Sequence, residues 1–217
     1  MNLEALLPTA VAVAIFILVG FPVHEFSHAY AAFRLGDSTA RWQGRLTLNP
    51  IKHFDPLGGS LLIITALISR GFMIGWAKPT PVNPYNLRYG HRGEALVAFA
   101  GPLSNLVMAA AAAIPIRLLL LDQTRFLTVA ANPAGLFVLN VLEMFIRINV
   151  VLMIFNLLPI PPLDGWRVLL GLVDPRTAFN LRQYEQYGFV VLLLLVFAGG
   201  PILSNVIDGA MRFLLGV

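Results

Sequence analysis

The chain contains no cysteine among its 217 residues. It can therefore form no disulfide and offer no thiolate to a metal ion, and its redox compartment stays undecided. Charge is scarce as well, because only 12% of the residues are Asp, Glu, Lys or Arg, about half the share in soluble domains. Hydrophobic residues make up 58% of the chain and the mean hydropathy is +0.77. These values exclude a sizeable soluble domain and indicate a protein that resides in a lipid bilayer.

Four apolar stretches are long enough to cross a bilayer, which takes about 20 residues. They run approximately from Leu6 to Leu35, from Leu96 to Leu121, from Leu136 to Leu158 and from Phe189 to Ile207. Three shorter apolar runs suggest re-entrant or interfacial pieces, namely Leu57–Ser69, Leu163–Val173 and Gly209–Val217. We therefore expect an all-α polytopic membrane protein with about four full spans plus a re-entrant or hairpin segment.

The segment between the first two spans does not follow a helical pattern. Residues Arg41–Leu48 alternate in a way that predicts a short strand, which Asn49 and Pro50 would end. The stretch Trp76–Pro84 carries prolines that cannot continue a helix. It is either an ordinary extended loop or backbone that lines a wet cavity. We expect short extended strands here, near the cytoplasmic face.

A metal-binding pattern follows directly on the first apolar run. His24 and His28 enclose Glu25 in the order His-Glu-x-x-His, and Leu6–Val23 before them carries no charged residue. Positions i and i+4 share one face of a helix, so both imidazoles can bind one metal ion, with Glu25 as general base toward an activated water. Imidazoles and a carboxylate close to hydrocarbon are costly unless they are used.

Two histidines are too few for a catalytic zinc ion, which usually takes three protein ligands and leaves one position for water. His53 and His91 lie beside charged loop residues, and we interpret both as solvated side chains. The better third ligand is Asp164, which follows the prolines after the third span and precedes Gly165. The alternative interpretation of Asp164 is an N-cap of the segment Trp166–Val173.

Several polar side chains fall inside the predicted spans. Asn105 either holds another helix or binds the backbone of a substrate. Glu143 and Arg147 stand four residues apart, and we expect them to neutralise each other. Asn149 and Asn156 share a helix face, where they either line a water path or join helices.

The motifs HEFSH, GPLSN and NLLPIPPLDG together resemble the site-2 protease family of intramembrane zinc metalloproteases. The segments GRLTLNPIKHFDPLGG and WAKPTPVNP resemble its compact bacterial and archaeal branch, and the likeness extends from about residue 10 to residue 175. The resemblance implies that His24, His28 and Asp164 bind one Zn²⁺ and that Glu25 is the catalytic base. It also implies that Asn156 polarises the scissile carbonyl or binds the substrate strand. Asn105 is a second candidate for that contact.

The expected function is hydrolysis of peptide bonds in or near the transmembrane segments of membrane-protein substrates. The resemblance implies a single-span regulatory protein as substrate, such as an anti-sigma factor, and the charge of +4 suggests no nucleic-acid partner. Residues 1–217 are expected to form one integral-membrane domain, with a core at about 6–175, a C-terminal span and tail at 186–217, and no segment long enough for a PDZ or CBS domain. The alternative is an inactive membrane zinc-binding scaffold or a transporter, although a scaffold would not need Glu25.

One shared metal ion also constrains the topology. His28 lies toward the end of the first span and Asp164 after the third, so a single crossing by residues 57–76 would put them at opposite leaflets. We therefore predict that this segment is a re-entrant hairpin or crosses twice. Eight Lys and Arg residues lie from Arg34 to Arg92, against two from Arg117 to Pro133. Excess basic residues mark the cytoplasmic side, so we expect the site near the cytoplasmic face of the cell membrane.

Overall fold

A computed structural model describes residues 3–68 and 78–217, and all regular structure in this part of the chain is helical. The longer helices are α1 (Leu3–Ile15), α2 (Phe21–Arg34), α5 (Pro56–Ile68), α6 (His91–Leu120), α8 (Pro133–Asn156), α11 (Gly188–Ala198) and α12 (Gly200–Leu215). The shorter ones are α3 (Thr39–Trp42), α4 (Pro50–His53), α7 (Gln123–Ala131), α9 (Asp164–Leu172) and α10 (Pro175–Arg182), with a π-turn at Phe16–Gly20 and 3₁₀ turns at Pro84–Asn86 and Glu185–Tyr187.

Three of the described helical stretches are long and apolar enough to cross a membrane. They are Leu6–Arg34, His91–Leu120 and Pro133–Asn156, which confirms the first three predicted spans. The predicted fourth span, Phe189–Ile207, is not one straight helix, because Glu185–Leu195 and Gly200–Leu215 meet at an angle of 80°. The break falls at Gly199, Gly200 and Pro201, where two flexible residues precede a residue without a backbone N–H.

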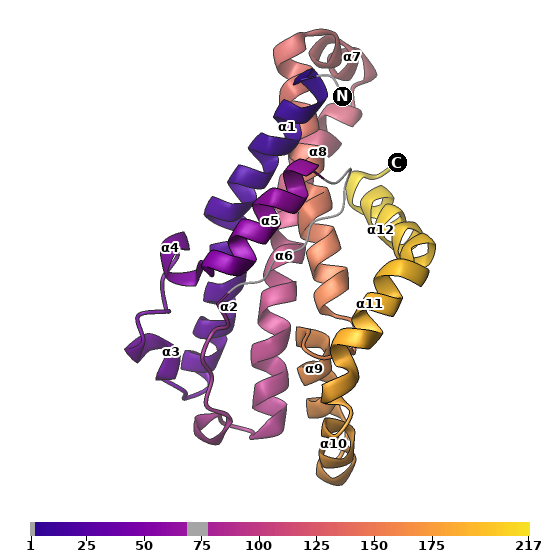
Figure 1. The fold of residues 1–217 in the computed structure, drawn as a ribbon. Helices are drawn as coiled ribbons and strands as arrows, with labels where there is room; N and C mark the ends of the chain where they lie inside the picture. The colour runs from indigo at the N-terminus through magenta and orange to yellow at the C-terminus, as the bar shows by residue number, and fades with distance from the viewer. Residues whose placement is uncertain (1–2, 69–77) are drawn as a thin grey trace.

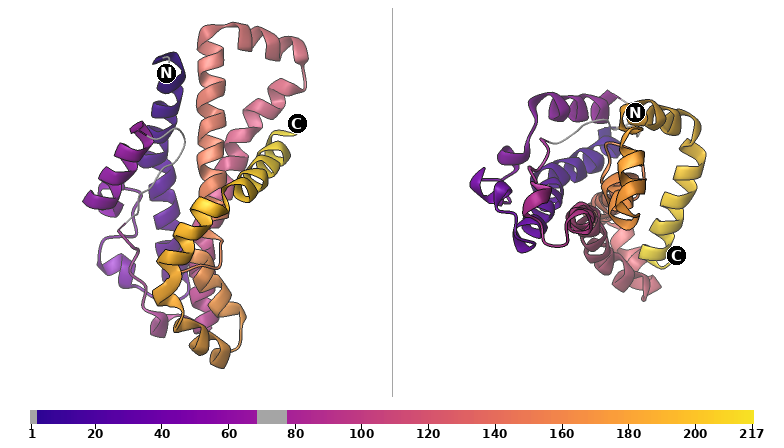
Figure 2. Two further views of the ribbon diagram at one scale, coloured as in Figure 1. Left: turned by 45° about the vertical axis from the view of Figure 1, so that its right-hand side comes forward. Right: turned by 90° about the horizontal axis from the view of Figure 1, so that it is seen from below.

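Helix α6 is the platform on which the other long helices pack. It contacts α2, α8 and α9, so it carries both segments that hold the predicted metal ligands. Figures 1 and 2 show α1 and α5 on one side of α8, and α11 and α12 on the other. One apolar cluster, including Ala12 and Val141, joins α1 to α8, and another, including Ile146 and Met211, joins α8 to α6 and α12.

The strand predicted at Arg41–Leu48 is wrong. Residues Thr39–Trp42 form the single helical turn α3, and the chain then turns at Gly44, whose φ is +66°. That left-handed conformation suits glycine and interrupts extended backbone. Residues 78–83 form no regular secondary structure, and no strand is present in the ranges that the structure describes. Lys78, Thr80 and Asn83 each precede a proline, which favours extended backbone, and Asn83 has φ −101° and ψ 105°.

The two ends of the predicted re-entrant segment lie together. Helix α5 begins at Pro56, soon after His53, and the backbone N–H of Lys78 donates to the His53 carbonyl at 3.1 Å. Arg45 donates to the carbonyls of Lys78 and Pro79, the latter at 3.1 Å. The chain thus returns at Lys78 to the place it left at His53. This agrees with the prediction that residues 57–76 do not form a single crossing of the membrane. Residues 69–76 lie outside the described ranges.

The predicted pairing of Glu143 with Arg147 is wrong. The Nη1 atom of Arg147 lies 3.2 Å from Oδ1 of Asp208 instead. Asp208 belongs to α12, which packs on α8. A tertiary contact has therefore replaced the local pair within one helix.

Asp37 joins the end of α2 to the segment before α6. Its fully buried carboxylate accepts hydrogen bonds from the backbone N–H and hydroxyl of Thr39, from the backbone N–H of Asn83 and from the side-chain amide of Asn86. Burial opposes ionisation of Asp37, but these hydrogen bonds outweigh it and hold the pKa of the carboxyl below its ordinary value. Asp37 thus fixes the far end of the extended segment 78–83.

Replacing Asp37 tests this role. Asp37→Asn removes the charge and turns one accepting oxygen into a donor that faces the N–H of Asn83, so we expect a loss of about 2 kcal/mol in the free energy of unfolding. Because the folded pKa is lowered, the contribution is present above the unfolded value near ~3.9 and is lost as the pH falls through the folded pKa. Thermal unfolding in detergent at pH 7 and below pH ~4 would measure both effects.

Asp122→Asn is the matched control, because Asp122 caps α7 through one oxygen and asparagine caps equally well. The ion pair of Asp122 with Arg125 is exposed, so its loss should cost about 1 kcal/mol at most. Equal stability of the two variants at pH 7 would contradict the role given to Asp37.

Candidate metal centre

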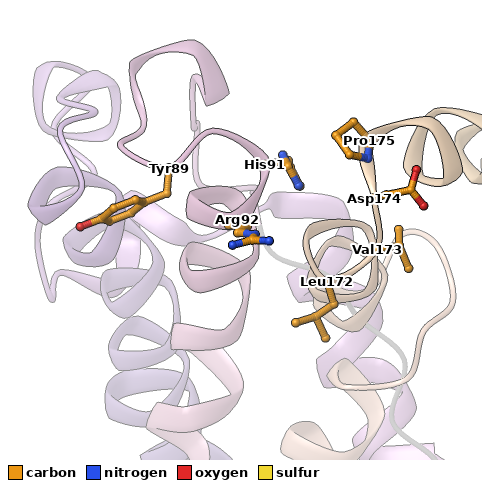
Figure 3. Close-up of a pocket in the computed structure, with 7 residues that line it drawn as sticks. All are labelled: Tyr89, His91, Arg92, Leu172, Val173, Asp174 and Pro175. Atoms are coloured by element: carbon orange, nitrogen blue, oxygen red, sulfur yellow. The ribbon is translucent and has the colours of Figure 1, made fainter.

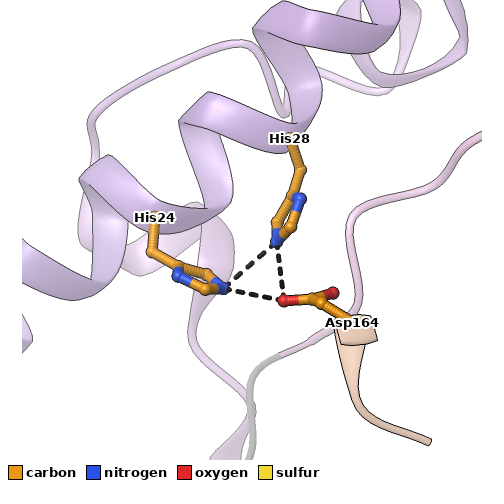
Figure 4. A group of neighbouring side chains, drawn as sticks. All are labelled: His24, His28 and Asp164. Atoms are coloured by element: carbon orange, nitrogen blue, oxygen red, sulfur yellow. Dashed lines mark hydrogen bonds and ion pairs between the residues drawn. The ribbon is translucent and has the colours of Figure 1, made fainter. Parts of the chain in front are cut away.

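Three side chains meet at the point that the sequence predicted. Nε2 of His24 lies 3.1 Å from Nε2 of His28, and Oδ2 of Asp164 lies 3.5 Å and 3.3 Å from these two atoms (Figure 4). In the ranges that the structure describes, this is the only group of three or more His, Cys, Asp or Glu residues with metal-binding geometry. Both histidines are buried, and the Asp164 side chain is 19% exposed.

The triangle of ligand atoms fits zinc. Tetrahedral zinc with ligand distances of about 2.0–2.1 Å requires ligand atoms roughly 3.3 Å apart, and the three measured separations bracket that value. Two imidazole nitrogens and one carboxylate oxygen also form a donor set that zinc accepts at catalytic sites. Three protein ligands leave the fourth position of the tetrahedron for water or substrate.

The outer nitrogens of both imidazoles are held by α6. Nδ1 of His28 donates to the carbonyl of Val97 at 2.8 Å, and Nδ1 of His24 lies 3.3 Å from Oδ1 of Asn105, which can only accept. These contacts fix the tautomer in which each Nε2 keeps its lone pair for a metal ion. The Asn105 side chain is fully buried, so its position suits orienting His24 rather than touching a substrate.

Glycines make the close approach possible. A Cβ on Gly101 would stand 2.2 Å from Nε2 of His28, so only glycine leaves room for the imidazoles beside α6. A Cβ on Gly165 would stand 2.3 Å from the carbonyl oxygen of Leu157, so α9 begins in contact with the backbone after α8. Both glycines belong to the motifs that carried the family resemblance, and packing explains them.

Asp164 begins α9, but it does not cap that helix. The N-cap position is Leu163, and no side chain caps the first turn. The N-cap interpretation is therefore wrong. A carboxyl group binds a metal ion in its ionised form, and Oδ2 of Asp164 lies within 3.5 Å of the Nε2 atoms of both histidines.

Glu25 is buried and is held by a residue that sequence reasoning missed. The hydroxyl of Thr80 donates to Oε2 of Glu25 at 2.7 Å. Arg45 fixes the two residues before Thr80 through their carbonyls, and its own side chain is 4% exposed. The sequence held one indication of this contact, namely the interpretation of Trp76–Pro84 as backbone that lines a cavity. Nothing local relates position 80 to position 25.

Asn156 ends α8, close to where α9 starts. Its side chain is half-buried, and among the described residues it has no hydrogen-bond partner. It therefore has a free amide and a free carbonyl at the end of α8 that adjoins Asp164. Asn149 differs, because its side chain is fully buried and its amide donates to the carbonyl of Phe145 at 2.9 Å.

The other two histidines lie outside the ligand group. His53 is fully buried and its Nε2 lies 2.7 Å from the Thr47 carbonyl, so the expectation of a solvated side chain is wrong for this residue. His91 lines an open hollow of about 490 Å³ between the start of α6 and the turn from α9 to α10 (Figure 3). The carboxylate in this hollow, Asp174, is already engaged as the N-cap of α10.

Gly101→Ala should weaken metal binding. The added Cβ would overlap His28 Nε2 and lie 2.7 Å from Cε1 of His24, so at least one imidazole must move. We expect zinc affinity to fall by about tenfold or more, as when groups that orient metal ligands are altered. Competition with a zinc chelator measures the affinity. Gly209→Ala is the control, because a Cβ there would meet no atom within 4 Å. Similar affinities for the two variants would contradict this account.

Thr80→Val should impair peptide hydrolysis without removing zinc. The substitution keeps the shape but deletes the hydroxyl that holds Oε2 of Glu25. A hydrogen bond to a charged group contributes about 1.5–3 kcal/mol, so a loss of kcat of roughly 10- to 100-fold is expected. Thr80→Ser keeps the hydroxyl and should retain most of the activity. A valine variant as active as the serine variant would show that Thr80 does not orient Glu25.

Comparison with known proteins agrees with this centre. The profile described as Peptidase family M50 matches residues 128–199. A Bacillus subtilis (strain 168) protein, YwhC, provisionally named a zinc metalloprotease, is 43% identical over 82% of this chain and 77% of its own length. Rip2 of Mycolicibacterium smegmatis, named in the same way, is 35% identical over 85% of this chain and 68% of its own, and Rip2 of Mycobacterium tuberculosis (strain H37Rv) is 30% identical over 91% and 70%.

No solved structure matches the chain. Membrane-length helices, a zinc-compatible ligand triangle and relatives matched over most of their length lead to one conclusion. The chain belongs to peptidase family M50, the site-2 type of intramembrane zinc metalloprotease.

Proposed function

We propose that His24, His28 and Asp164 bind a single zinc ion and that Glu25 is the general base for cleavage of peptide bonds in or near transmembrane segments. The observation that carries this proposal is the ligand triangle, whose sides of 3.1, 3.3 and 3.5 Å fit one face of a zinc tetrahedron. The triangle joins two histidines of α2 to Asp164 of α9. Glu25, next to His24 on α2, supplies a carboxylate that can accept a proton.

When bound, zinc polarises the scissile carbonyl and lowers the pKa of a water molecule at the site. Glu25 takes the proton of the attacking water and later passes it to the leaving amide nitrogen. Thr80 keeps the carboxylate of Glu25 in one orientation during this exchange. The free amide of Asn156 donates a hydrogen bond to the carbonyl oxygen as negative charge develops on it.

The substrate must unwind before it can be cut, because a transmembrane helix satisfies its own carbonyl groups. The extended residues 78–83 offer replacement partners. Neither Thr80 nor Val82 has a partner for its backbone N–H among the described residues, and in extended backbone these two groups point to the same side. Pro79 and Pro81 have no N–H at all. We propose that an unwound substrate segment pairs with Thr80 and Val82 beside Glu25, a form of β-augmentation.

The site is proposed to face the cytoplasm. α3 and α10 lie at the opposite end of the molecule from the N-terminus and α7 (Figure 1). The basic residues of the segment from Arg34 to Arg92 outnumber those from Arg117 to Pro133, and the return of the chain at Lys78 allows those that the structure describes to share one side. An excess of Lys and Arg favours the cytoplasmic side.

An inactive zinc-binding scaffold or a transporter is the alternative. A transporter needs polar groups along a path through the membrane, whereas most buried polar side chains here adjoin α2 or the segment that covers it. A scaffold has no use for a buried carboxylate next to its ligands. The hydroxyl that Thr80 directs onto Glu25 therefore favours the hydrolytic function.

Glu25→Gln decides between these functions. The amide cannot accept the proton, and loss of a general base typically costs 10²–10⁴-fold in rate, so we expect cleavage of a synthetic single-span substrate in detergent to fall by about 100-fold or more. Zinc content per chain should stay unchanged. Zinc removal by a chelator should abolish cleavage by the wild type, and added zinc should restore it.

Glu94→Gln is the matched control, because Glu94 lies on α6 with Arg182 as its partner at 3.6 Å. It should cleave at the wild-type rate. Equal cleavage by wild type and Glu25→Gln, or no cleavage by the zinc-loaded wild type, would refute the protease function.

A further inference from the structure

Helix α8 has a polar strip on its exposed side. Asn140, Glu143 and Arg147 follow one another at spacings of three and four residues, so they share one face of the helix. Asn140 and Glu143 are exposed, and the Arg147 side chain is 42% exposed. The strip lies near the middle of a helix long and apolar enough to cross the membrane, where polar side chains are expensive.

The strip lies between two packed sides of α8. Val141 and Ile148 are buried against α1, whereas Ile146 and Val150 are buried against α6 and α12. Glu143 is exposed, whereas these four residues are buried. Figures 1 and 2 agree with this arrangement, because α1 and α5 flank α8 on one side and α12 flanks it on the other.

Glu143 has no partner on α8 or α12. Arg147, the cation on the same face, is already paired with Asp208 of α12. Among the described residues Glu143 has no ion pair and no hydrogen bond. The strip therefore presents one acidic side chain without a partner, in the middle of a helix of membrane-spanning length.

We infer that this strip is a subsite for a transmembrane substrate helix that carries a Lys or Arg at the depth of Glu143. A basic side chain would neutralise Glu143, and the amide of Asn140 could add a hydrogen bond. The occupant is a helix because only helices and closed barrels satisfy their backbone inside a bilayer. The inference rests on the proposed function and adds a substrate class to it, namely single spans with a buried positive charge.

The distance to the metal centre sets where that charge must lie. Glu143 and Asn156 are on the same helix, about 20 Å apart at a rise of ~1.5 Å per residue. A substrate that is helical along α8 and extended near the metal centre, at ~3.3 Å per residue, covers this distance with roughly 10 residues. The basic residue should therefore stand about 10 residues from the cleaved bond, toward the extracytoplasmic side.

Binding and cleavage should be measured separately. The Glu25→Gln chain is reconstituted in phosphatidylcholine vesicles with synthetic Leu-Ala spans that carry either Lys or Leu at that position, and energy transfer between labels reports association. We expect the Lys span to bind about 5- to 30-fold more tightly, as for polar contacts between membrane helices. Adding Glu143→Gln should abolish the preference, and adding Glu143→Lys should shift it to a span that carries Glu.

Val138→Gln is the matched control, because Val138 is 54% exposed on α8 but lies ~140° around the helix from Glu143. It should leave the preference for Lys intact. In the chain with Glu25 restored, Glu143→Gln should raise KM for the Lys span without changing kcat or the cleavage of the Leu span.

The outcomes separate the two proposals. Equal binding of the Lys and Leu spans, or equal effects of Val138→Gln and Glu143→Gln, would overturn the subsite even if both spans are cleaved. A preference for Lys that depends on Glu143, in a chain that cleaves neither span, would support the subsite and refute the protease function.

Discussion

The fold depends on bringing Asp164 within 3.5 Å of His24 and His28. The ligands belong to α2 and α9, which the chain separates by two helices of membrane-spanning length. Helix α6 solves this problem because it packs against both. Glycines allow α6 to approach α2 and α9 closely. Gly101 of α6 leaves room for the imidazoles of α2, and a Cβ on Gly171 of α9 would stand 2.3 Å from Cβ of Ala95 on α6. Small residues are how helices approach each other in a membrane.

The meeting of His24, His28 and Asp164 could be predicted from sequence because each part of the prediction is local or follows from the chemistry of zinc. His24 and His28 share a helix face by spacing alone, and zinc chemistry then requires a third ligand, for which Asp164 was the best placed. Because all three ligands must lie on the same side of the membrane, the sequence also predicted that residues 57–76 return to the side from which they start. The contact between Lys78 and His53 agrees with this prediction. Where chemistry requires residues to meet, sequence reasoning reaches beyond local structure.

Other features depend on contacts that no local pattern records. The alternation in Arg41–Leu48 resembled a strand, but Asp37 and Gly44 turn the chain there. Glu143 lies one helical turn from Arg147, but Arg147 pairs with Asp208 of α12 instead. His53 looked like a loop residue, although the return of the chain buries it completely. In each case long-range packing decided the outcome, and a period or spacing in the sequence cannot carry that information.

The segment with three prolines, which sequence reasoning left between a loop and a cavity lining, turns out to be tied down along its length. Lys78 is held by His53, Thr80 by Glu25, and Asn83 by Asp37, so buried polar groups fix it at three points over the catalytic helix. Pro79 and Pro81 have no N–H, and among the described residues the N–H groups of Thr80 and Val82 have no partner. A mobile loop would have to be ordered whenever a substrate unwound, at a cost of about 1–2 kcal/mol for each residue. A segment already held in extended form avoids that cost, and the buried polar groups that hold it also orient the base. Two of the three ligands and Glu25 belong to α2, and segment 78–83 is bound to Glu25 through Thr80, so these polar groups gather around one helix of a largely apolar bundle.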